Sequence, residues 1–481
     1  MSQLPPGPSA RPSVQLMRWS RHPTELLEEC AATYGNTFTL RFPGYPPLVF
    51  LTDPAAIKEV FTGTSDEIRQ GPFPPFMRPQ MGDGSLLFLD GAPHQRERKL
   101  LMPAFHHERM VAYGHTIRSI TDQVIDRWPI GQPFPIHAAM QEIALDTILR
   151  TVFGMEDGER LTALRDVLKV WSEQGRSSRR PSSILTLLAL MLIPGPTIDR
   201  LYRVSERKPT VAGRAVDISA LFPWRDAVRV QRRIDAILAT EITRARAETD
   251  RDRTDILSML IASRDADGRP MSDSDLRDEM MTFLIAGQET TATALSWCMH
   301  LVLTHPQVAE RLRTELKALP PDEIAGGRDI LRFEYLDATI KEALRLRPVV
   351  PHAARLLGVP RRLSGFDLPA GVMVLPSSYL TQRRADLFPD PTVFRPERFL
   401  GAHSSPYEYF PFGGGVRRCI GQAFAMYEMK IVIARVLSRV TMHPAPGEPV
   451  QTVLRSVTFR PSNGVPVVVT ARRDGSGSDR G

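Results

Sequence analysis

Hydrophobic and polar residues follow two different patterns along the chain. Two short runs rich in β-branched and aromatic residues, Thr37–Phe42 and Leu48–Leu51, flank a Pro- and Gly-rich connection and predict a β-hairpin. From Asp53 onward, most of the chain has the spacing of helices. The pattern therefore predicts a mainly α fold of the α+β class, in which a large helical unit carries a small β-rich subregion.

The longest helical pattern extends from Ser272 to Thr304. It begins with Ser272 and has Asp275 three residues later, as in a capping box, and it stops at His305-Pro306. At a rise of 1.5 Å per residue, this stretch makes a helix of about 45 Å, which is long enough to cross a large domain.

A helix of this length bears on the domain organisation. The length of 481 residues alone would also allow about three domains, but such a helix fits one large unit better. We expect a single domain over residues 1–481, with residues 1–23 as an extended leader and a first helix near Thr24. Residues 474–481 have low complexity and are expected to form a disordered tail.

Composition indicates a soluble globular protein, with 42% hydrophobic residues and 61 basic against 54 acidic side chains, a net charge of +7. The three cysteines, Cys30, Cys298 and Cys419, are too few and too far apart for a disulfide framework, a four-ligand zinc site or an iron–sulfur cluster. They indicate a reducing compartment. Because Met1–Pro8 lacks the features of a signal peptide and no apolar run approaches about 20 residues, we expect a cytoplasmic protein.

One segment concentrates the positive charge. Residues 176–233 contain twelve Lys or Arg and four acidic residues, together with the apolar run Ile184–Ile193. We interpret the run as a buried helix flanked by solvated charges. Two alternatives stay open: a contact with a membrane surface, at most peripheral, or recognition of an anionic substrate such as a carboxylate.

Cys419 ends the glycine-rich stretch Phe412–Cys419 and stands just before a predicted helix from Gln422. Glycine allows a positive φ and a close backbone approach, while turn amides, a helix N-terminus and neighbouring arginines favour a thiolate. A lone thiolate in this setting suits a nucleophile or an axial ligand to haem iron. An incidental small core residue is the alternative.

Three other segments bear on this choice. Glu342 and Arg345 share a face of a helix predicted over Tyr335–Leu346, and Arg398 lies in the Pro-broken loop Phe394–Phe399. Taken alone, such a Glu–Arg pair is typical of a helix surface.

The third segment is Ala286–Thr291, in the middle of the long helix, where propensity favours Ala or Leu instead of Gly, Glu and Thr. Gly287 leaves room beside the helix, and Thr290 can bond back to a carbonyl and bend it. Such a groove with an acid and an alcohol is suited to holding water and moving protons.

Together, these residues resemble the cytochrome P450 family. Its haem-binding signature is matched at Phe412, Gly413, Gly415, Arg417, Cys419 and Gly421. The Glu342–Arg345 pair, the loop with Arg398 and the Ala286–Thr291 segment appear in the family's order, and the resemblance extends from about Leu4 to Ala471. It implies the cytochrome P450 fold and haem b, iron protoporphyrin IX, as cofactor.

The resemblance also assigns roles at the haem. Cys419 would be the proximal ligand of the iron, and Phe412 would pack near its sulfur. The propionate partners would be His94, Arg98, Arg355 and Arg417, and further cofactor contacts would come from Gly413, Ala286 and Gly421.

Other roles follow for residues around the cofactor. Glu342, Arg345 and Arg398 would form a structural ion-pair network behind the haem. Thr290 and Glu289 would be the catalytic pair that delivers protons during dioxygen activation.

The substrate pocket can be placed by family correspondence. It would be lined by Phe73, Phe76, Leu87, Ile285, Ala286, Val349, Val350 and Val457. Because all are apolar, the expected substrate is an apolar small molecule, such as a fatty acid or a terpenoid. Several of these residues could equally fill the core.

The implied activity is that of a monooxygenase that uses O2 and two electrons to hydroxylate or epoxidise its substrate. The chain has no dinucleotide fingerprint and no cluster cysteines, so electrons must come from a separate ferredoxin or flavodoxin with its NAD(P)H-dependent reductase. A basic docking face would contain Arg96, Lys99, Arg109 and Arg418.

Two other functions stay open. A peroxide-driven hydroxylase or isomerase would not need the Glu289–Thr290 pair, and a non-catalytic haem-binding protein would leave the distal pocket without purpose. The sequence contains no recognisable nucleic-acid-binding module, so a nucleic-acid partner is not expected.

Overall fold

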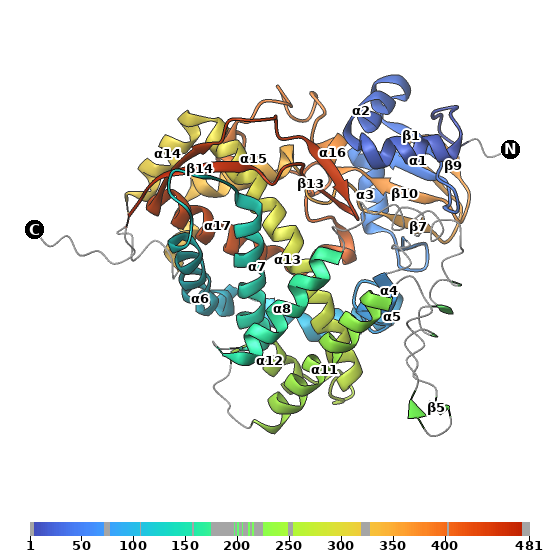
Figure 1. Cartoon of the computed structure of the whole chain (residues 1–481). Helices are drawn as coiled ribbons and strands as arrows, with labels where there is room; N and C mark the ends of the chain where they lie inside the picture. The colour runs from blue at the N-terminus through green and yellow to red at the C-terminus, as the bar shows by residue number, and fades with distance from the viewer. Residues whose placement is uncertain are drawn as a thin grey trace, which may run out of the picture.

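The helix α13 (Asp273–Thr304) has 32 residues and runs through the middle of the molecule (Figure 1). It begins as predicted, because the Ser272 side chain accepts a hydrogen bond from the backbone N–H of Asp275 at 3.1 Å. Most of its side chains are buried. Among the helices packed against it are α7 (Ile136–Phe153), α11 (Arg225–Ala247), α15 (Glu334–Leu346) and α17 (Gln422–Arg439).

The computed structural model describes residues 4–473 except 72–76, 106, 156–157, 175–196, 249–253, 319–327, 402–403 and most of 198–224. The predicted apolar helix Ile184–Ile193, most of the basic segment and the predicted tail 474–481 lie outside the described residues. Within them, no helix is both long enough and apolar enough to cross a membrane.

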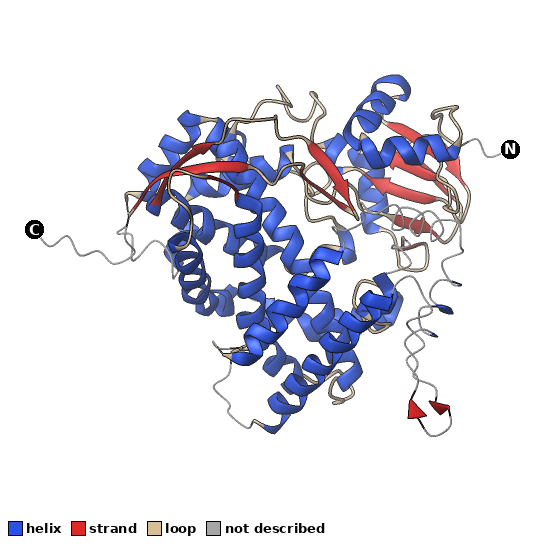
Figure 2. Ribbon diagram, in the orientation of Figure 1, coloured by secondary structure: helices blue, strands red, loops and turns tan. Residues whose placement is uncertain are grey.

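Further helices surround these elements and make the molecule mainly α, as the sequence predicts (Figure 2). They are α1 (Pro12–Arg21), α2 (Pro23–Tyr34), α3 (Pro54–Thr62), α4 (Met77–Met81), α5 (Gly91–Leu101), α6 (His107–Asp126), α8 (Glu159–Gln174), α12 (Ile256–Ala262), α14 (Pro306–Leu316) and α16 (Ser378–Thr381). The 3-10 turns are η1 (Met102–Phe105), η4 (Arg328–Arg332), η5 (Pro396–Phe399) and η6 (Gly415–Arg417).

The largest sheet has five strands in the order β1–β2–β10–β7–β3. Its strands are β1 (Thr37–Leu40), β2 (Leu48–Leu51), β10 (Met373–Pro376), β7 (Arg355–Leu357) and β3 (Ile68–Gln70). The predicted hairpin is confirmed, because β1 and β2 pair antiparallel with Thr37 opposite Leu51.

Smaller sheets complete the β-rich part. One has the order β11–β14–β4, and the others are the pairs β12–β13, β5–β6 and β8–β9. Their strands are β11 (Val440–Pro444), β14 (Pro466–Arg472), β4 (Pro133–Pro135), β12 (Thr452–Arg455), β13 (Thr458–Pro461), β5 (Thr210–Val211), β6 (Arg214–Ala215), β8 (Arg361–Leu363) and β9 (Phe366–Leu368).

The N-terminal segment differs from the expected extended leader. Residues 12–21 form α1, which has a proline in its first turn. The buried Gln15 side chain fixes this helix: its amide donates to Pro8 O and Ala10 O, and its oxygen accepts from Arg41 N. These bonds depend on tertiary contacts, so the local pattern did not reveal the helix.

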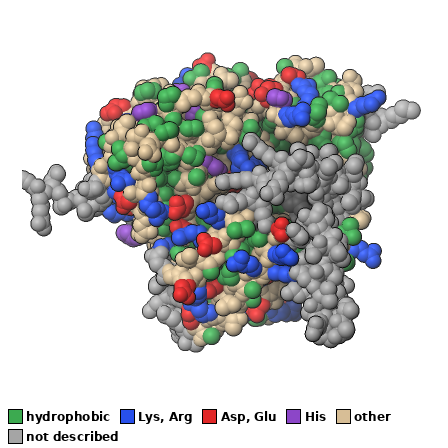
Figure 3. Space-filling model, in the orientation of Figure 1, with side chains coloured by type: hydrophobic (Ala, Val, Ile, Leu, Met, Phe, Trp, Pro, Cys, Tyr) green, Lys and Arg blue, Asp and Glu red, His purple; other side chains and the backbone are tan. Residues whose placement is uncertain are grey.

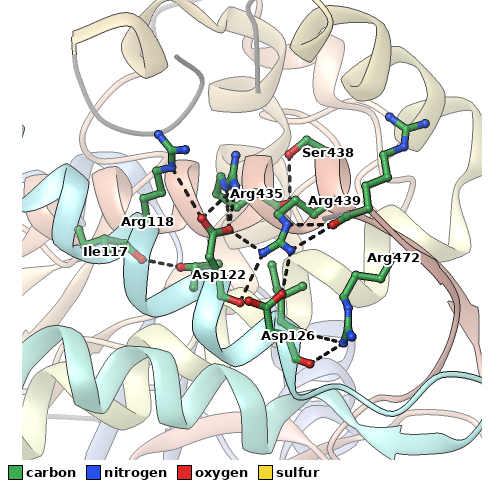
Figure 4. Close-up of polar contacts among 11 residues, drawn as sticks. Ile117, Arg118, Asp122, Asp126, Arg435, Ser438, Arg439 and Arg472 are labelled. Carbon is green, nitrogen blue, oxygen red and sulfur yellow. Dashed lines mark hydrogen bonds and ion pairs between the residues drawn. The ribbon is translucent and has the colours of Figure 1, made fainter. Parts of the chain in front are cut away.

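A cluster of ion pairs joins α6, α17 and β14 (Figure 4). The Asp122 carboxylate accepts hydrogen bonds from Arg435 at 2.8 Å and from Arg439 at 3.1 Å, and both arginines are buried. Arg439 also pairs with Asp126, while Arg472 donates to the carbonyl of Asp126 at 2.6 Å. The cluster fixes the C-terminal half of α17, whose N-terminus follows Cys419.

Candidate haem site

The loop before α17 is folded tightly around Cys419. The N–H of Cys419 donates to Phe412 O at 3.0 Å. Gly415 has a φ of +67°, and a Cβ there would lie 2.1 Å from the carbonyl oxygen of Phe61 in α3. Any larger residue would therefore disrupt this close approach. A Cβ on Gly413 or Gly421 would meet open space.

Cys419 faces a space within the protein. Its surface is exposed, yet burial raises the pKa of its thiol, so the exposed surface faces an interior space and not the bulk solvent. A backbone hydrogen bond from Gly421 and the charges of Arg98 and Arg418 act against burial, in the direction that the sequence predicted. Burial outweighs these three effects, so the pKa of the Cys419 thiol in the protein alone is raised. A metal cation on the sulfur would reverse the balance.

Four cationic or ionisable groups converge beside the loop. His94 and Arg98 lie on α5, Arg355 begins β7, and Arg417 ends η6. Burial and the charges of Arg417 and Arg98 lower the pKa of His94 to about 4. Burial and the charge of Arg417 lower the pKa of Arg355 to about 10. The positive charges of this cluster repel one another. The cluster is therefore suited to bind a ligand with more than one negative charge.

Asp90 is the anion that the sequence analysis missed. It precedes α5, accepts hydrogen bonds from Gln70 N at 3.2 Å, and pairs with Arg417. The Arg417 guanidinium also donates to the carbonyls of Leu86 and Leu89. The signal that could have indicated it is the position of Asp90 directly before the helix that carries His94 and Arg98.

The middle of α13 offers the other candidate surface. Ala286 is exposed although most of this helix is buried, and the Thr290 hydroxyl donates to the carbonyl of Ala286 at 2.6 Å. The expected room beside Gly287 is occupied, because a Cβ there would lie 2.8 Å from Cδ1 of Ile148 in α7. Gly287 therefore serves close packing of two helices, and the free surface lies at Ala286.

Glu289 turns towards α7 and β13. Its carboxylate accepts a hydrogen bond from Gln141 at 2.6 Å and lies 3.7 Å from His137 and 3.5 Å from Arg460. Burial raises the pKa of Glu289, but His137, Gln141 and Arg460 outweigh it, so the pKa lies below its ordinary value. No local pattern indicated these three neighbours, because they are remote from Glu289 along the chain.

The three residues of the expected ion-pair network lie together. Glu342 accepts hydrogen bonds from Arg345 at 2.7 and 2.8 Å and from Arg398 at 3.2 Å. Arg345 also donates to the carbonyls of Gln382 and Pro391, both at 2.7 Å. Glu342 and Arg345 are completely buried. Every charge is thus paired, which makes the loss of one partner costly.

The expected pocket residues have different environments. Leu87, Ile285 and Val457 are half-buried, whereas Val349 is buried within the main core and Val350 is exposed. Core packing is therefore the role that the structure shows for Val349. The other two, Phe73 and Phe76, lie outside the described residues.

The residues of the expected docking face also differ. Lys99 and Arg418 are exposed. Arg96 pairs with Asp265 at 2.9 Å, so its charge is partly neutralised. The side chain of Arg109 lies outside the described part of the chain.

A cysteine beside a cluster of cations, together with a long central helix that carries an alcohol at an exposed turn, is typical of the class of haem-thiolate proteins. The residues present fit haem as cofactor: the thiol of Cys419 would hold the iron, and the cation cluster would bind the two negatively charged propionates.

The chain belongs to the cytochrome P450 family, whose family model matches residues 5–466. It is 37% identical to a putative cytochrome P450 135B1 of Mycobacterium tuberculosis over 99% of this chain and 93% of that protein. It is 33% identical to a putative cytochrome P450 138 of Mycobacterium bovis over 92% of this chain and 90% of that protein. A solved structure, a cyanobacterial CYP120A1 with bound retinoic acid, superposes with a TM-score of 0.77 at 24% identity, covering 98% of this chain and all of that one.

Membership in the family establishes the general activity. The protein is a monooxygenase with haem b as cofactor, and it takes electrons from a redox partner. The predicted fold and enzyme class are confirmed.

Proposed function

We propose that the protein hydroxylates or epoxidises an apolar small molecule of the fatty acid or terpenoid class, with electrons from a ferredoxin or flavodoxin and its NAD(P)H-dependent reductase. The observation that carries the proposal is the turn of α13 at Ala286, where an exposed surface lies between the apolar Ile285 and the Thr290 hydroxyl. The half-buried Leu87 and Val457 offer further apolar surface. Such a site favours an apolar ligand next to one proton-handling group.

Each group of residues has a separate task in this function. When bound, the haem supplies the activation of O2. Cys419 holds the iron, while His94, Arg98, Arg355 and Arg417 bind the propionates and so fix the orientation of the cofactor. Glu342, Arg345 and Arg398 hold α15 and η5 together. The Thr290 hydroxyl donates a hydrogen bond to Ala286 O in this structure, and it would supply a proton during turnover.

The Glu289–Thr290 pair supports the use of O2. A peroxide-driven hydroxylase or an isomerase does not need protons delivered by an acid and an alcohol. Glu289 keeps a third of its side chain exposed and is held by polar neighbours, so it can exchange protons with its surroundings.

The test is a spectroscopic screen of the purified holoprotein. The reduced protein with carbon monoxide should first give the absorption typical of a thiolate ligand. Fatty acids, terpenoids and polar control compounds are then titrated into the ferric protein, where a substrate that displaces water shifts the iron from low to high spin. We expect shifts with apolar compounds and oxidised products in their presence. Spin shifts and products confined to polar compounds would overturn the proposed substrate class.

A further inference from the structure

His352 lies in the segment between α15 and β7, and its imidazole packs against aromatic rings. The ring centroids of Trp19 and Phe50 are each 5.7 Å from the centroid of the imidazole. Burial lowers the pKa of His352 to about 4, and no charged group of the described residues contributes to this shift. The imidazole is therefore uncharged at neutral pH and is a single polar group among apolar neighbours.

The imidazole faces a space within the protein. His352 is only half-buried, yet burial alone lowers its pKa, so its accessible surface does not face the bulk solvent. Trp19 on α1 is also half-buried, and its ring packs against the rings of Phe42 and Phe459 at centroid distances of 6.0 and 6.3 Å. The space at His352 therefore has an aromatic wall.

The segment that carries His352 adjoins the expected substrate pocket. Val350 precedes His352 by two residues and is exposed. The backbone N–H of Phe459 in β13 donates to Val349 O at 2.7 Å and so holds the segment against this strand. Because β13 begins directly after the half-buried Val457, the segment borders the apolar surface that the proposed function uses.

The two ring nitrogens of His352 have different surroundings. Nδ1 is buried and has no hydrogen-bond partner. Nε2 also has no partner in the described part of the chain, but it is not enclosed. A neutral imidazole carries one N–H, and a buried N–H without an acceptor is strongly avoided in proteins. The proton therefore belongs on Nε2, where it is available to a ligand as a donor.

A free donor on an apolar wall selects a ligand with an oxygen acceptor. Hydroxyl, carbonyl and ester oxygens accept such a hydrogen bond without carrying a charge. A carboxylate at this position would need a positive counter-charge, and no charged group of the described residues acts on His352. The surroundings therefore favour an uncharged oxygen on an apolar skeleton.

We propose that His352 is a specificity-determining residue, which donates a hydrogen bond from Nε2 to an uncharged oxygen of the substrate. This inference rests on the proposed function and narrows it. The substrate is an apolar molecule with a hydroxyl, carbonyl or ester oxygen at a distance from the carbon that is oxidised. The contacts of the imidazole with Trp19 and Phe50 keep the donor in place.

The test compares two ligands of the ferric holoprotein that differ in one oxygen, methyl nonyl ketone and undecane. Calorimetric and spin-shift titrations should give a Kd for the ketone that is lower by about fivefold or more, because only the ketone accepts the bond. His352→Phe keeps an aromatic ring but has no donor, so it should remove this difference and leave the affinity for undecane nearly unchanged. His352→Gln, which supplies an amide N–H, should restore part of the difference.

Infrared difference spectra give a readout that a merely structural role would not move. The carbonyl band of the bound ketone, identified by isotope labelling, should lie at lower wavenumber than in hexane, because a hydrogen bond weakens the C=O bond. This shift should be absent in His352→Phe. The matched control is His300→Phe, which replaces another histidine whose pKa burial lowers, and it should keep both the ketone preference and the band shift.

The outcomes separate this role from others. Equal affinities for the ketone and undecane in the unmodified protein, or no binding of the ketone, overturn the proposal whether or not a variant folds. A ketone preference or band shift that persists in His352→Phe also overturns it. Dodecanoate that binds more tightly than the ketone, and loses this advantage in His352→Phe, overturns the choice of an uncharged oxygen. A failure of the proposed function is distinct, because no apolar compound of the screen would then shift the spin state.

Discussion

At the residue scale, Thr290 and Thr304 form a natural comparison on α13. Each hydroxyl donates to the carbonyl four residues earlier, at 2.6 Å for Thr290 and 2.8 Å for Thr304. Such a bond has the same small effect on the helix in both places. Thr290 differs from Thr304 by its position at the exposed turn of Ala286. An effect on catalysis that occurs when Thr290 is replaced, but not when Thr304 is replaced, therefore reflects the chemistry of the site and not the stability of the helix.

Thr290→Ala should uncouple electron use from product formation. Without the hydroxyl, proton delivery loses its last donor, and the share of NAD(P)H consumption that ends as hydrogen peroxide should rise about threefold or more. The measurement compares peroxide, product and NAD(P)H in one reaction. Thr304→Ala is the control, and unchanged coupling in Thr290→Ala would show that the alcohol has no part in proton delivery.

Glu342→Ala should yield little or no holoprotein. It leaves the buried Arg345 and Arg398 without their carboxylate, which costs on the order of 3–5 kcal/mol of unfolding free energy. Haem absorbance per protein and urea unfolding measure the loss. Glu334→Ala, an exposed acid in the first turn of the same helix, should retain normal haem content. Equal haem content in both variants would argue against a structural network.

At the element scale, α17 joins the cysteine loop to the rest of the protein. Its C-terminal half is held by Arg435 and Arg439 in the cluster with Asp122. Its middle carries Glu428, a carboxyl that is only 1% exposed. The helix thus combines satisfied charges at one end with a buried acid that is not fully hydrogen-bonded, because its Oε1 has no partner.

Glu428 should make stability fall as pH rises. Burial raises its pKa from the ordinary 4.5 to about 8, so the folded protein keeps the carboxyl neutral where the unfolded chain already ionises it. The unfolded state is therefore favoured increasingly between pH 4.5 and about 8. Glu428→Gln should raise the unfolding free energy at pH 8 by roughly a few kcal/mol and have little effect near pH 4.5.

Urea unfolding of Glu428→Gln and of the unmodified protein at several pH values measures this difference. The exposed Glu448→Gln serves as control and should follow the unmodified protein throughout. Parallel curves for Glu428→Gln and the unmodified protein would contradict a raised pKa.

At the scale of the whole molecule, the described part of the visible face carries charges of both signs. Acidic and basic side chains are interspersed there instead of gathered by sign (Figure 3). Arg127 with Glu142 and Arg18 with Glu29 are examples of exposed pairs. Lys99 and Arg418 are exposed cations that could take part in electrostatic recognition of a redox partner.

Reduction by a ferredoxin should slow steeply with salt. Charge attraction raises association rates by about tenfold or more at low ionic strength and is screened at high ionic strength. Lys99→Glu and Arg418→Glu should slow reduction at low salt, whereas the exposed Lys317→Glu on the end of α14 should not. Stopped-flow reduction measures the rates. A rate indifferent to salt would count against electrostatic docking.

Local signals account for most of what the sequence predicted. The capped start of α13, the hairpin and the spacing of Glu342 and Arg345 each depend on neighbours within a few residues. Long-range contacts account for what it missed. Gln15 stabilises α1 through Arg41, and Gly287 accommodates Ile148 of another helix.

The candidate site divides in the same way. Its motif residues could be found, because family signatures are contiguous in sequence. The partners His137 and Asp90 could not, since their roles arise only when α7 meets α13 and when α5 meets the cysteine loop.

The N-terminal residues 5–7 cover the edge of the five-stranded sheet. β1 is an edge strand of the five-stranded sheet, and residues 5 and 6 cover it: Thr39 donates to Pro6 O at 2.8 Å and to Pro5 O at 2.7 Å. Gly7 permits this contact, because a Cβ there would lie 1.9 Å from Thr39 O. A chain shortened to begin at residue 12 would expose the strand edge and invite pairing between molecules. Light scattering would show this self-association, and residues 5–7 therefore protect the sheet edge against aggregation.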